Sequence, residues 1–155
     1  DRSVSRGLGD VYKRQGLEAG KYRLALKTPK DQIINVEYTR DNSKKKAVYK
    51  KSKAIHLKSD IDSIYTSTEK AARWYKVSVS STKKRKAVTL SKDSVGGGFK
   101  FRVYQKGKRL KTVRVTKNDK VKTVKLPKKK GTYYVKVTKL TSKTTGAYYL
   151  GTYTY

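Results

Sequence analysis

The chain has 155 residues, 35% of them hydrophobic and 10% aromatic, which allows one complete domain and part of another. It contains no cysteine, so disulfides, thiol nucleophiles and cysteine-ligated zinc are excluded. Its 41 Lys and Arg residues against 11 Asp and Glu residues give a formal net charge of +30, which favours acidic partners such as nucleic acid, anionic membranes or anionic wall polymers.

Residues 1–15 do not share the pattern of the rest of the chain. They are polar, carry no sustained period and end in the string GDVYKRQ. That string resembles translated sequencing-adapter bases at the ends of metagenomic gene predictions. We therefore interpret the segment as a non-biological tail, the alternative being an ordinary flexible N-terminus. On this interpretation the gene begins further upstream, and any signal peptide or leading domain has been lost.

Residues 16–40 predict a β-hairpin. Alternation places apolar side chains on one face of a strand at 21–27 and of a second strand at 33–38, and Pro29 lies in the turn between them. An isolated hairpin is marginal in water, so this one needs a sheet to join. That sheet belongs either to a truncated preceding module or to the domain that follows.

Residues 41–155 predict a separate β-domain after a polar break at 39–46. Weak apolar positions between 47 and 64 fit short edge strands, and a helix at 61–72 is a lesser alternative. From residue 73 the alternation is stronger. It predicts strands at 74–80, 87–90, 99–104, 110–116 and 121–126.

The strand at 99–104 alternates most clearly. Phe99, Phe101 and Val103 are predicted to face the core, and Lys100 and Arg102 to face solvent. In the two strands that follow, the apolar spacing changes parity, which predicts a bulge or a change of buried face.

Residues 127–149 predict a closing β-hairpin, in which a basic turn ends at Gly131 and a Ser/Thr/Gly turn joins two Tyr-rich strands. Its first strand alternates, with Tyr133, Val135 and Val137 inward and Tyr134, Lys136 and Thr138 outward. Many short strands with turn signals roughly every 8–12 residues, and no helical period between them, predict an all-β fold. We expect an antiparallel β-sandwich of the jelly-roll or immunoglobulin-like type.

Four pieces of the sequence suggest a family. They are a polar lead-in at Asn42 and Ser43, the strand RWYKVSV at 73–79, the hairpin FKFRVYQKGKRL at 99–110, and a Gly-turn and Tyr-rich pattern at 126–150. In this order they resemble the bacterial pre-peptidase C-terminal (PPC) domain, a β-sandwich appended to secreted peptidases and surface proteins. The resemblance runs from Asn42 to the end of the chain.

The resemblance implies that residues 41–155 are a non-catalytic accessory or adhesion module of a secreted or cell-surface bacterial protein. Residues 16–40 would then close a preceding copy, so neighbouring domains of a tandem array are expected partners. No stretch approaches the roughly 20 apolar residues of a membrane helix.

Groups that could carry chemistry are few. Asp41, Asn42, Asp60 and Asp62 offer oxygen ligands, but calcium needs several oxygens and the surrounding lysines oppose a dication. The family's lead-in is commonly acidic, whereas this one is rich in lysine. His56 is the one histidine, and we interpret it as a surface or half-buried residue. We expect no catalytic, cofactor or metal site, and hence no enzyme.

Basic residues at outward and turn positions predict a surface for polyanions. The candidates are Lys100, Arg102, Lys106, Lys108, Arg109, Lys128, Lys129, Lys130 and Lys136. The expected partners are anionic cell-wall polymers or acidic glycans, held electrostatically. One alternative is a ligand-free spacer whose lysines coat the strands and keep the chain soluble.

Nucleic-acid binding is the other alternative. Aromatic and basic residues alternate at 99–104 and 133–139, as on β-surfaces that stack bases. A stacking surface needs both kinds on one exposed face, however, and here Phe99 and Phe101 are predicted to face the core. Trp74 is interpreted as a core residue.

Overall fold

Nine strands and one short 3-10 helix make up the part of the chain that the computed structural model describes, namely residues 21, 23, 48–58, 60–65, 72–93, 97–116, 118–144 and 146–155. The predicted tail at 1–15 lies outside these residues, as does the hairpin at 16–40 apart from two single positions. In chain order the elements are η1 (Lys51–Lys53), β1 (Ile55–His56), β2 (Ile61–Tyr65), β3 (Arg73–Val79), β4 (Lys86–Asp93), β5 (Phe99–Gln105), β6 (Lys108–Val115), β7 (Val121–Lys125), β8 (Gly131–Lys139) and β9 (Gly146–Thr154).

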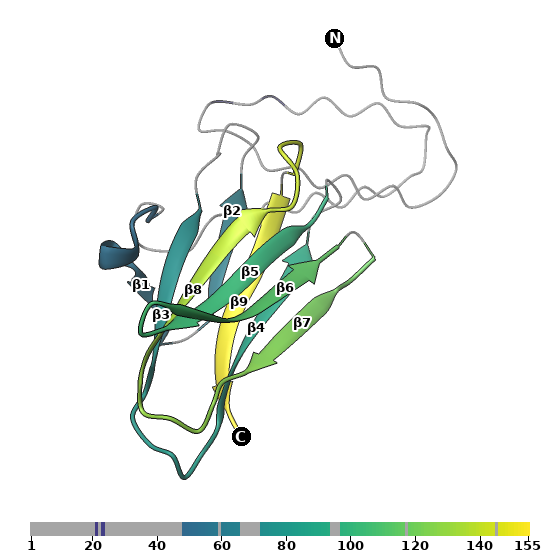
Figure 1. Ribbon diagram of the computed structural model, residues 1–155. Coiled ribbons are helices and arrows are strands. Elements are labelled where there is room, and N and C mark those ends of the chain that lie inside the picture. Colours follow the sequence, from purple (N-terminus) through teal and green to yellow (C-terminus); the bar gives the residue numbers. More distant parts are fainter. Residues whose placement is uncertain are drawn as a thin grey trace.

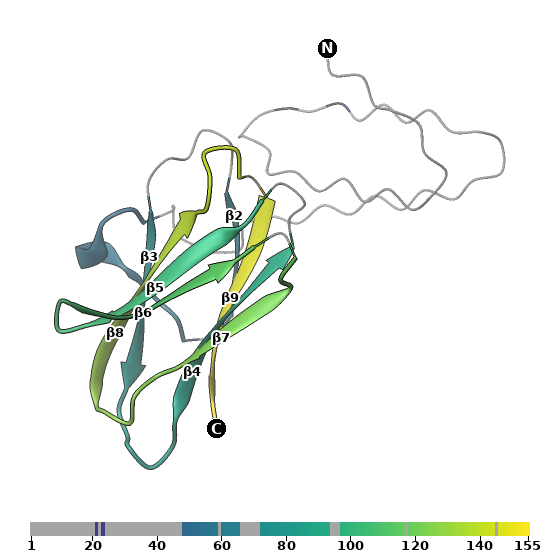
Figure 2. The same cartoon turned by 45° about the vertical axis from the view of Figure 1, so that its right-hand side comes forward.

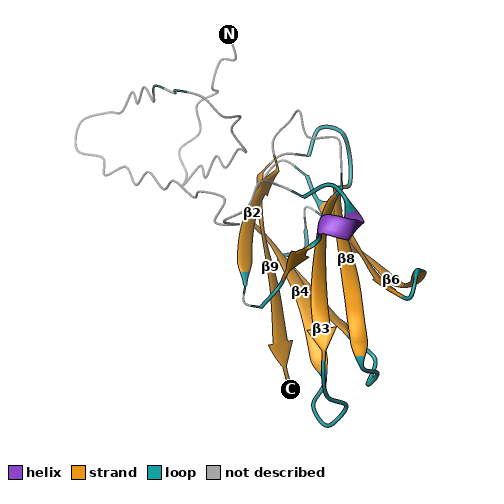
Figure 3. Ribbon diagram, turned by 90° about the vertical axis from the view of Figure 1, so that its left-hand side faces the viewer, coloured by secondary structure: helices purple, strands orange, loops and turns teal. Residues whose placement is uncertain are grey.

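The strands form two sheets that pack face to face (Figures 1 and 3). The five-stranded sheet has the order β1-β3-β8-β5-β6, and the four-stranded sheet has the order β2-β9-β4-β7. Every pair is antiparallel except β1 with β3, which is parallel. The predicted antiparallel β-sandwich is confirmed.

Alternation along the strands builds the core between the sheets. In β5 the side chains of Phe99, Phe101 and Val103 are at most 1% exposed, as predicted. The hydroxyl groups of Tyr75 in β3 and Tyr148 in β9 are hydrogen-bonded to each other in the core. This hydrogen bond links one sheet to the other. Burial of each large apolar side chain contributes about 1.5–3 kcal/mol, and this term drives the packing of the sheets.

The predicted closing hairpin at 127–149 is wrong. Its two strands exist as β8 and β9, but they belong to different sheets. β8 is paired on both edges, with β3 and β5, and β9 is paired on both edges, with β2 and β4. The connection therefore crosses from one sheet to the other, which lets the apolar faces of β8 and β9 meet in the core.

The changes of parity have two different causes. In the β5–β6 ladder Val103 pairs with Lys111 while Tyr104 pairs with Arg109, so Leu110 is the extra residue of a β-bulge. The β4–β7 ladder is continuous, and Val121 lies on its outer side with 52% exposure. Only the first of these two strands is bulged.

Two expectations about element bounds also change. Ile61–Tyr65 is a strand paired with β9, so the alternative of a helix at 61–72 is wrong where the structure describes it. The strand predicted at 87–90 extends over Lys86–Asp93, because it pairs with β7 on one edge and β9 on the other.

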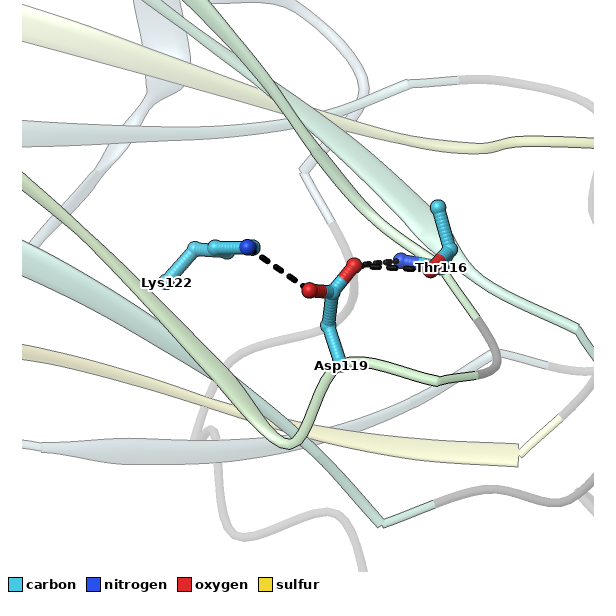
Figure 4. A network of polar contacts seen from close by, with 3 residues as sticks. All are labelled: Thr116, Asp119 and Lys122. Atoms are coloured by element: carbon cyan, nitrogen blue, oxygen red, sulfur yellow. Dashed lines mark hydrogen bonds and ion pairs between the residues drawn. The ribbon is translucent and has the colours of Figure 1, made fainter.

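The carboxylate of Asp119 holds the turn between β6 and β7 (Figure 4). Its Oδ2 accepts hydrogen bonds from the Thr116 backbone nitrogen at 2.9 Å and from the Thr116 hydroxyl at 2.7 Å, and its Oδ1 lies 2.7 Å from the Lys122 ammonium. The hydrogen bond from Lys122, followed by those from Thr116, lowers the pKa of Asp119 well below its ordinary value. The ionised carboxylate therefore stabilises the turn.

Acid is expected to weaken this turn. The pKa of Asp119 is lower in the folded than in the unfolded chain, so its contribution is fully present above the unfolded pKa of about 4 and is lost as the pH falls below it. We expect the melting temperature of the wild type to fall more steeply than that of Asp119→Asn between about pH 5 and pH 2. Thermal unfolding followed by circular dichroism measures both slopes, and parallel curves would contradict this role.

Candidate polyanion-binding surface

Three of the nine predicted basic residues lie together on the outer face of the five-stranded sheet. Arg102 in β5 is the direct partner of Lys136 in β8, and Lys100 lies two positions before Arg102 on the same side of β5. All three side chains are partly exposed. Pairing between strands thus brings together residues that are more than 30 positions apart in sequence.

The other six lie in or directly beside two connections at one end of the sandwich (Figure 2). The β5–β6 turn and the start of β6 carry Lys106, Lys108 and Arg109, and the β7–β8 connection carries Lys128, Lys129 and Lys130. Gln105 at the end of β5 joins the two connections, because its Nε2 donates to the carbonyl oxygen of Lys130 at 3.5 Å. All six side chains are exposed.

A third basic connection lies at the same end and is missing from the sequence-based set. Val79 at the end of β3 pairs with Gly131 at the start of β8, so the β3–β4 connection lies beside the β7–β8 connection. It carries Lys83, Lys84 and Arg85, all exposed. The run KKRK at 83–86 is the signal that could have identified it. We call these nine exposed cations, which lie in the three connections and at the start of β6, the basic end.

Three aromatic side chains share the outer face with the cations. Trp74 in β3 lies directly opposite Lys136 in β8 in the strand ladder, and Tyr104 in β5 lies directly opposite Tyr134 in β8. The rings of Trp74 and Tyr104 lie 5.6 Å apart between centroids at an interplanar angle of 43°. The Nζ of Lys136 lies 5.3 Å from the centroid of the Trp74 ring, and that of Lys51 lies 4.8 Å from the centroid of the Tyr134 ring.

These positions correct the interpretation of Trp74 as a core residue. In β3 the alternation places Tyr75 in the core with 1% exposure and Trp74 on the opposite, outer side. Aromatic and basic residues therefore do share one exposed face. The aromatic residues are different ones from the inward-facing Phe99 and Phe101.

The cations of the outer face repel one another. The pKa of Lys100 is lowered, chiefly by Arg102, then by partial burial and by the charges of Arg114 and Lys136. Strands β1, β3, β5, β6 and β8 contain no Asp or Glu to offset this charge. An anion on this face would relieve the repulsion.

The outer face of the four-stranded sheet differs in kind. Its described part includes Thr89 and Thr123, which are hydrogen-bonded at 3.0 Å, and Tyr149, whose hydroxyl donates to Asp60 Oδ2 at 2.8 Å. Lys125 at its edge strand lies over the Tyr155 ring. The strands of the five-stranded sheet thus carry Lys and Arg but no Asp or Glu, whereas β2 and β4 of the four-stranded sheet include Asp62 and Asp93.

Groups for catalysis or metal binding do not gather in the described part of the chain, which holds no cluster of three or more His, Cys, Asp or Glu residues. His56 lies at the surface with Nε2 3.1 Å from the Ser78 hydroxyl, and partial burial and nearby lysines lower the pKa of His56. Asp60 is held by Tyr149. Asp41 and Asn42 lie outside the described residues, as does the side chain of Asp62.

A shallow cleft of about 330 Å³ separates the edge strands β6 and β7. Core residues Val103, Val124 and Leu126 form its floor, and Leu110 and Lys111 lie at its rim. The cleft thus lies between the edges of the two sheets. Its lining offers a ligand apolar contact and the side chains of Lys111, Thr123 and Lys125, but no carboxylate or imidazole.

The chain was also compared with known proteins. No family model and no curated protein matches the chain. Among solved structures, the chain is similar to a crystal structure of the pre-peptidase C-terminal domain of a collagenase from Bacillus anthracis, with a TM-score of 0.49 and 17% identity over 64% of this chain and 92% of that chain. In the described residues, no helix has the length and apolarity needed to cross a membrane.

Proposed function

We propose that this chain contains a non-catalytic accessory module of a secreted or cell-surface bacterial protein, which binds anionic cell-wall polymers or acidic glycans. The observation that carries the proposal is the basic end, where three connections bring nine exposed cations together. The outer face of the five-stranded sheet continues this positive surface, because Arg109 at the basic end pairs directly with Tyr104.

The chemistry of the surface suits a polymer better than a small anion. Each exposed ion pair contributes only about 0–1 kcal/mol, so useful affinity requires many contacts at once. A polyanion supplies them along its length and releases counterions as it binds. Such contacts are screened over about 8 Å at physiological ionic strength, and binding by the module is therefore sensitive to salt.

Retention on purified anionic cell wall tests the proposal. We expect Lys128→Gln/Lys129→Gln, which removes two charges from the basic end, to elute at a clearly lower salt concentration than the wild type. The matched control Lys120→Gln/Lys143→Gln removes two exposed charges from connections at the opposite end, and we expect it to elute close to the wild type. Intact folding of both variants is checked by circular dichroism.

Three outcomes contradict the proposal. Retention that is unchanged between low and high salt would exclude electrostatic binding. Equal shifts in the two double variants would mean that diffuse net charge, and not the basic end, holds the polymer. Absence of retention at low salt would favour the ligand-free spacer.

A further inference from the structure

The outer face of the five-stranded sheet carries more than an electrostatic site needs. Trp74, Tyr104 and Tyr134 come from three neighbouring strands, β3, β5 and β8, and are only partly buried. We call these three rings, together with Lys100, Arg102 and Lys136, the aromatic–basic patch. Since neighbouring strands are about 4.8 Å apart, the backbone positions of the rings span about 10 Å across the sheet.

Aromatic rings on a sheet surface are suited to flat, unsaturated ligand groups. In single-strand binding proteins, basic side chains follow the backbone while successive bases stack on aromatic residues. Sheets that recognise RNA stack two or three bases in this way. The Tyr104–Tyr134 pair and the Trp74–Tyr104 contact at 5.6 Å supply such a group of rings, and Lys136 and Arg102 lie beside it, in one cross-strand row with Trp74.

The polar groups of the patch match phosphate better than sugar hydroxyls. Lys and Arg only donate hydrogen bonds, and a phosphodiester only accepts them. A polysaccharide also presents many hydroxyl donors, for which carboxylate and amide oxygens are good acceptors. The strands of this sheet carry no Asp, Glu or Asn, and their one Gln, Gln105, is buried and not on the outer face. A phosphate polymer without rings would leave the aromatic residues unused.

The lysines that lie over the rings can move to a ligand. The Nζ of Lys136 is 5.3 Å from the Trp74 centroid, on a flexible four-carbon stem. When a base occupies the ring face, the ammonium can turn to the adjacent phosphate. The repulsion that lowers the pKa of Lys100 is relieved by the same phosphates.

We infer that the aromatic–basic patch binds single-stranded nucleic acid, with bases stacked on Trp74, Tyr104 and Tyr134 and phosphates held by Lys100, Arg102 and Lys136. The inference rests on the proposed function, because the patch continues the positive surface of the basic end through the pair of Tyr104 and Arg109. It names single-stranded nucleic acid as the polyanion that the aromatic rings select. It predicts a preference for single strands over duplex, since duplex bases are not available for stacking.

The protein contains its own probe for the test, because Trp74 is the one tryptophan of the chain. The intact protein is titrated with a short oligothymidylate, with a duplex of the same length, with polyphosphate and with polygalacturonate, and tryptophan fluorescence is excited where tyrosine does not absorb. We expect the oligothymidylate to bind most tightly and to quench Trp74. We expect polyphosphate and polygalacturonate to bind more weakly and without comparable quenching.

Each other outcome is decisive. Tighter binding of the duplex, or binding of the single strand without quenching, would overturn stacking while the proposed polyanion function stands. Tighter binding and quenching by polygalacturonate would overturn nucleic acid in favour of an acidic glycan on the same rings. Failure of every polymer to bind at low salt would overturn both the inference and the proposed function.

Variants separate stacking from charge. We expect Tyr104→Ala, which keeps the Trp74 probe, to weaken oligothymidylate binding by about tenfold and to leave the salt dependence unchanged. Arg102→Gln is expected to reduce the slope of log K against log salt by roughly 0.7, the value for one phosphate contact on a single strand. Tyr153→Ala, at an exposed tyrosine on the other sheet, is the control and should change neither quantity. Equal losses in Tyr104→Ala and Tyr153→Ala would overturn the assignment.

Discussion

Replacing Phe99 by alanine is expected to destabilise the β-sandwich by about 3–5 kcal/mol. The Phe99 side chain is fully buried, and its ring lies 5.0 Å from that of Tyr148 between centroids. Since Phe99 belongs to β5 and Tyr148 to β9, truncation opens a cavity between the two sheets. Domains of this kind have total stabilities of about 5–15 kcal/mol, so the loss is a large part of the whole. Denaturant unfolding should show a lower midpoint.

The control for this prediction lies on the same strand. Tyr104 is also aromatic and also in β5, but it points to the outer face. We expect Tyr104→Ala to cost no more than about 1 kcal/mol. Should Phe99→Ala fail to fold, Phe99→Leu is expected to retain a measurable transition with a smaller loss. Similar losses for Phe99→Leu and Tyr104→Ala would contradict the arrangement of β5.

Which face each strand buries could be predicted because alternation is a local property. Consecutive side chains of a strand point to opposite sides, so the pattern of β5 already distinguishes Phe99 and Phe101 from Lys100 and Arg102. The same argument placed Tyr133 and Val135 in the core, and both are fully buried. These inferences need no knowledge of the partner strand.

Strand pairing could not be predicted in the same way. Two apolar-faced strands joined by a short turn fit a hairpin within one sheet and an arch between two sheets equally well. The choice between them depends on which distant strands take the free edges. For β8 those strands are β3 and β5, which are separated from it by many residues of the chain. The predicted hairpin failed for this reason.

The candidate site was predicted only in pieces. The basic runs are visible in the sequence, but their meeting at one end depends on contacts such as Val79 with Gly131 and Gln105 with Lys130. The aromatic–basic patch was predicted only in part, because Tyr134 and Lys136 were placed on the outer face whereas Trp74 was interpreted as a core residue and Tyr104 was assigned to neither face. The rings of Trp74 and Tyr104 are in contact because β3 and β5 lie on either side of β8. The order of the strands in the sheet cannot be read from the alternation of residues in the sequence.

Replacing Gly98 by alanine is expected to destabilise the domain by about 1–3 kcal/mol, because the added methyl group has no space. A Cβ at this position would lie 2.1 Å from the carbonyl oxygen of Val115 and 2.7 Å from a methyl carbon of Leu140. The first of these atoms is backbone at the end of β6. It cannot turn aside as a side chain can, so β5 and β6 would have to separate at their paired ends, where Phe99 faces Val115.

A matched variant separates the steric clash at position 98 from the effect of replacing a glycine as such. Gly107 has a positive φ of 78° in the β5–β6 turn but no atom within 4 Å of an added Cβ. Gly107→Ala should therefore cost only the backbone strain of that conformation, about 1–2 kcal/mol, and Gly107→Asn less, because Asn tolerates the left-handed region. Gly98→Ala should also disturb the β5–β6 ladder, which hydrogen exchange at the Val115 end can detect. Unchanged exchange there would mean that the close approach of β6 to Gly98 does not prevent a larger residue at position 98.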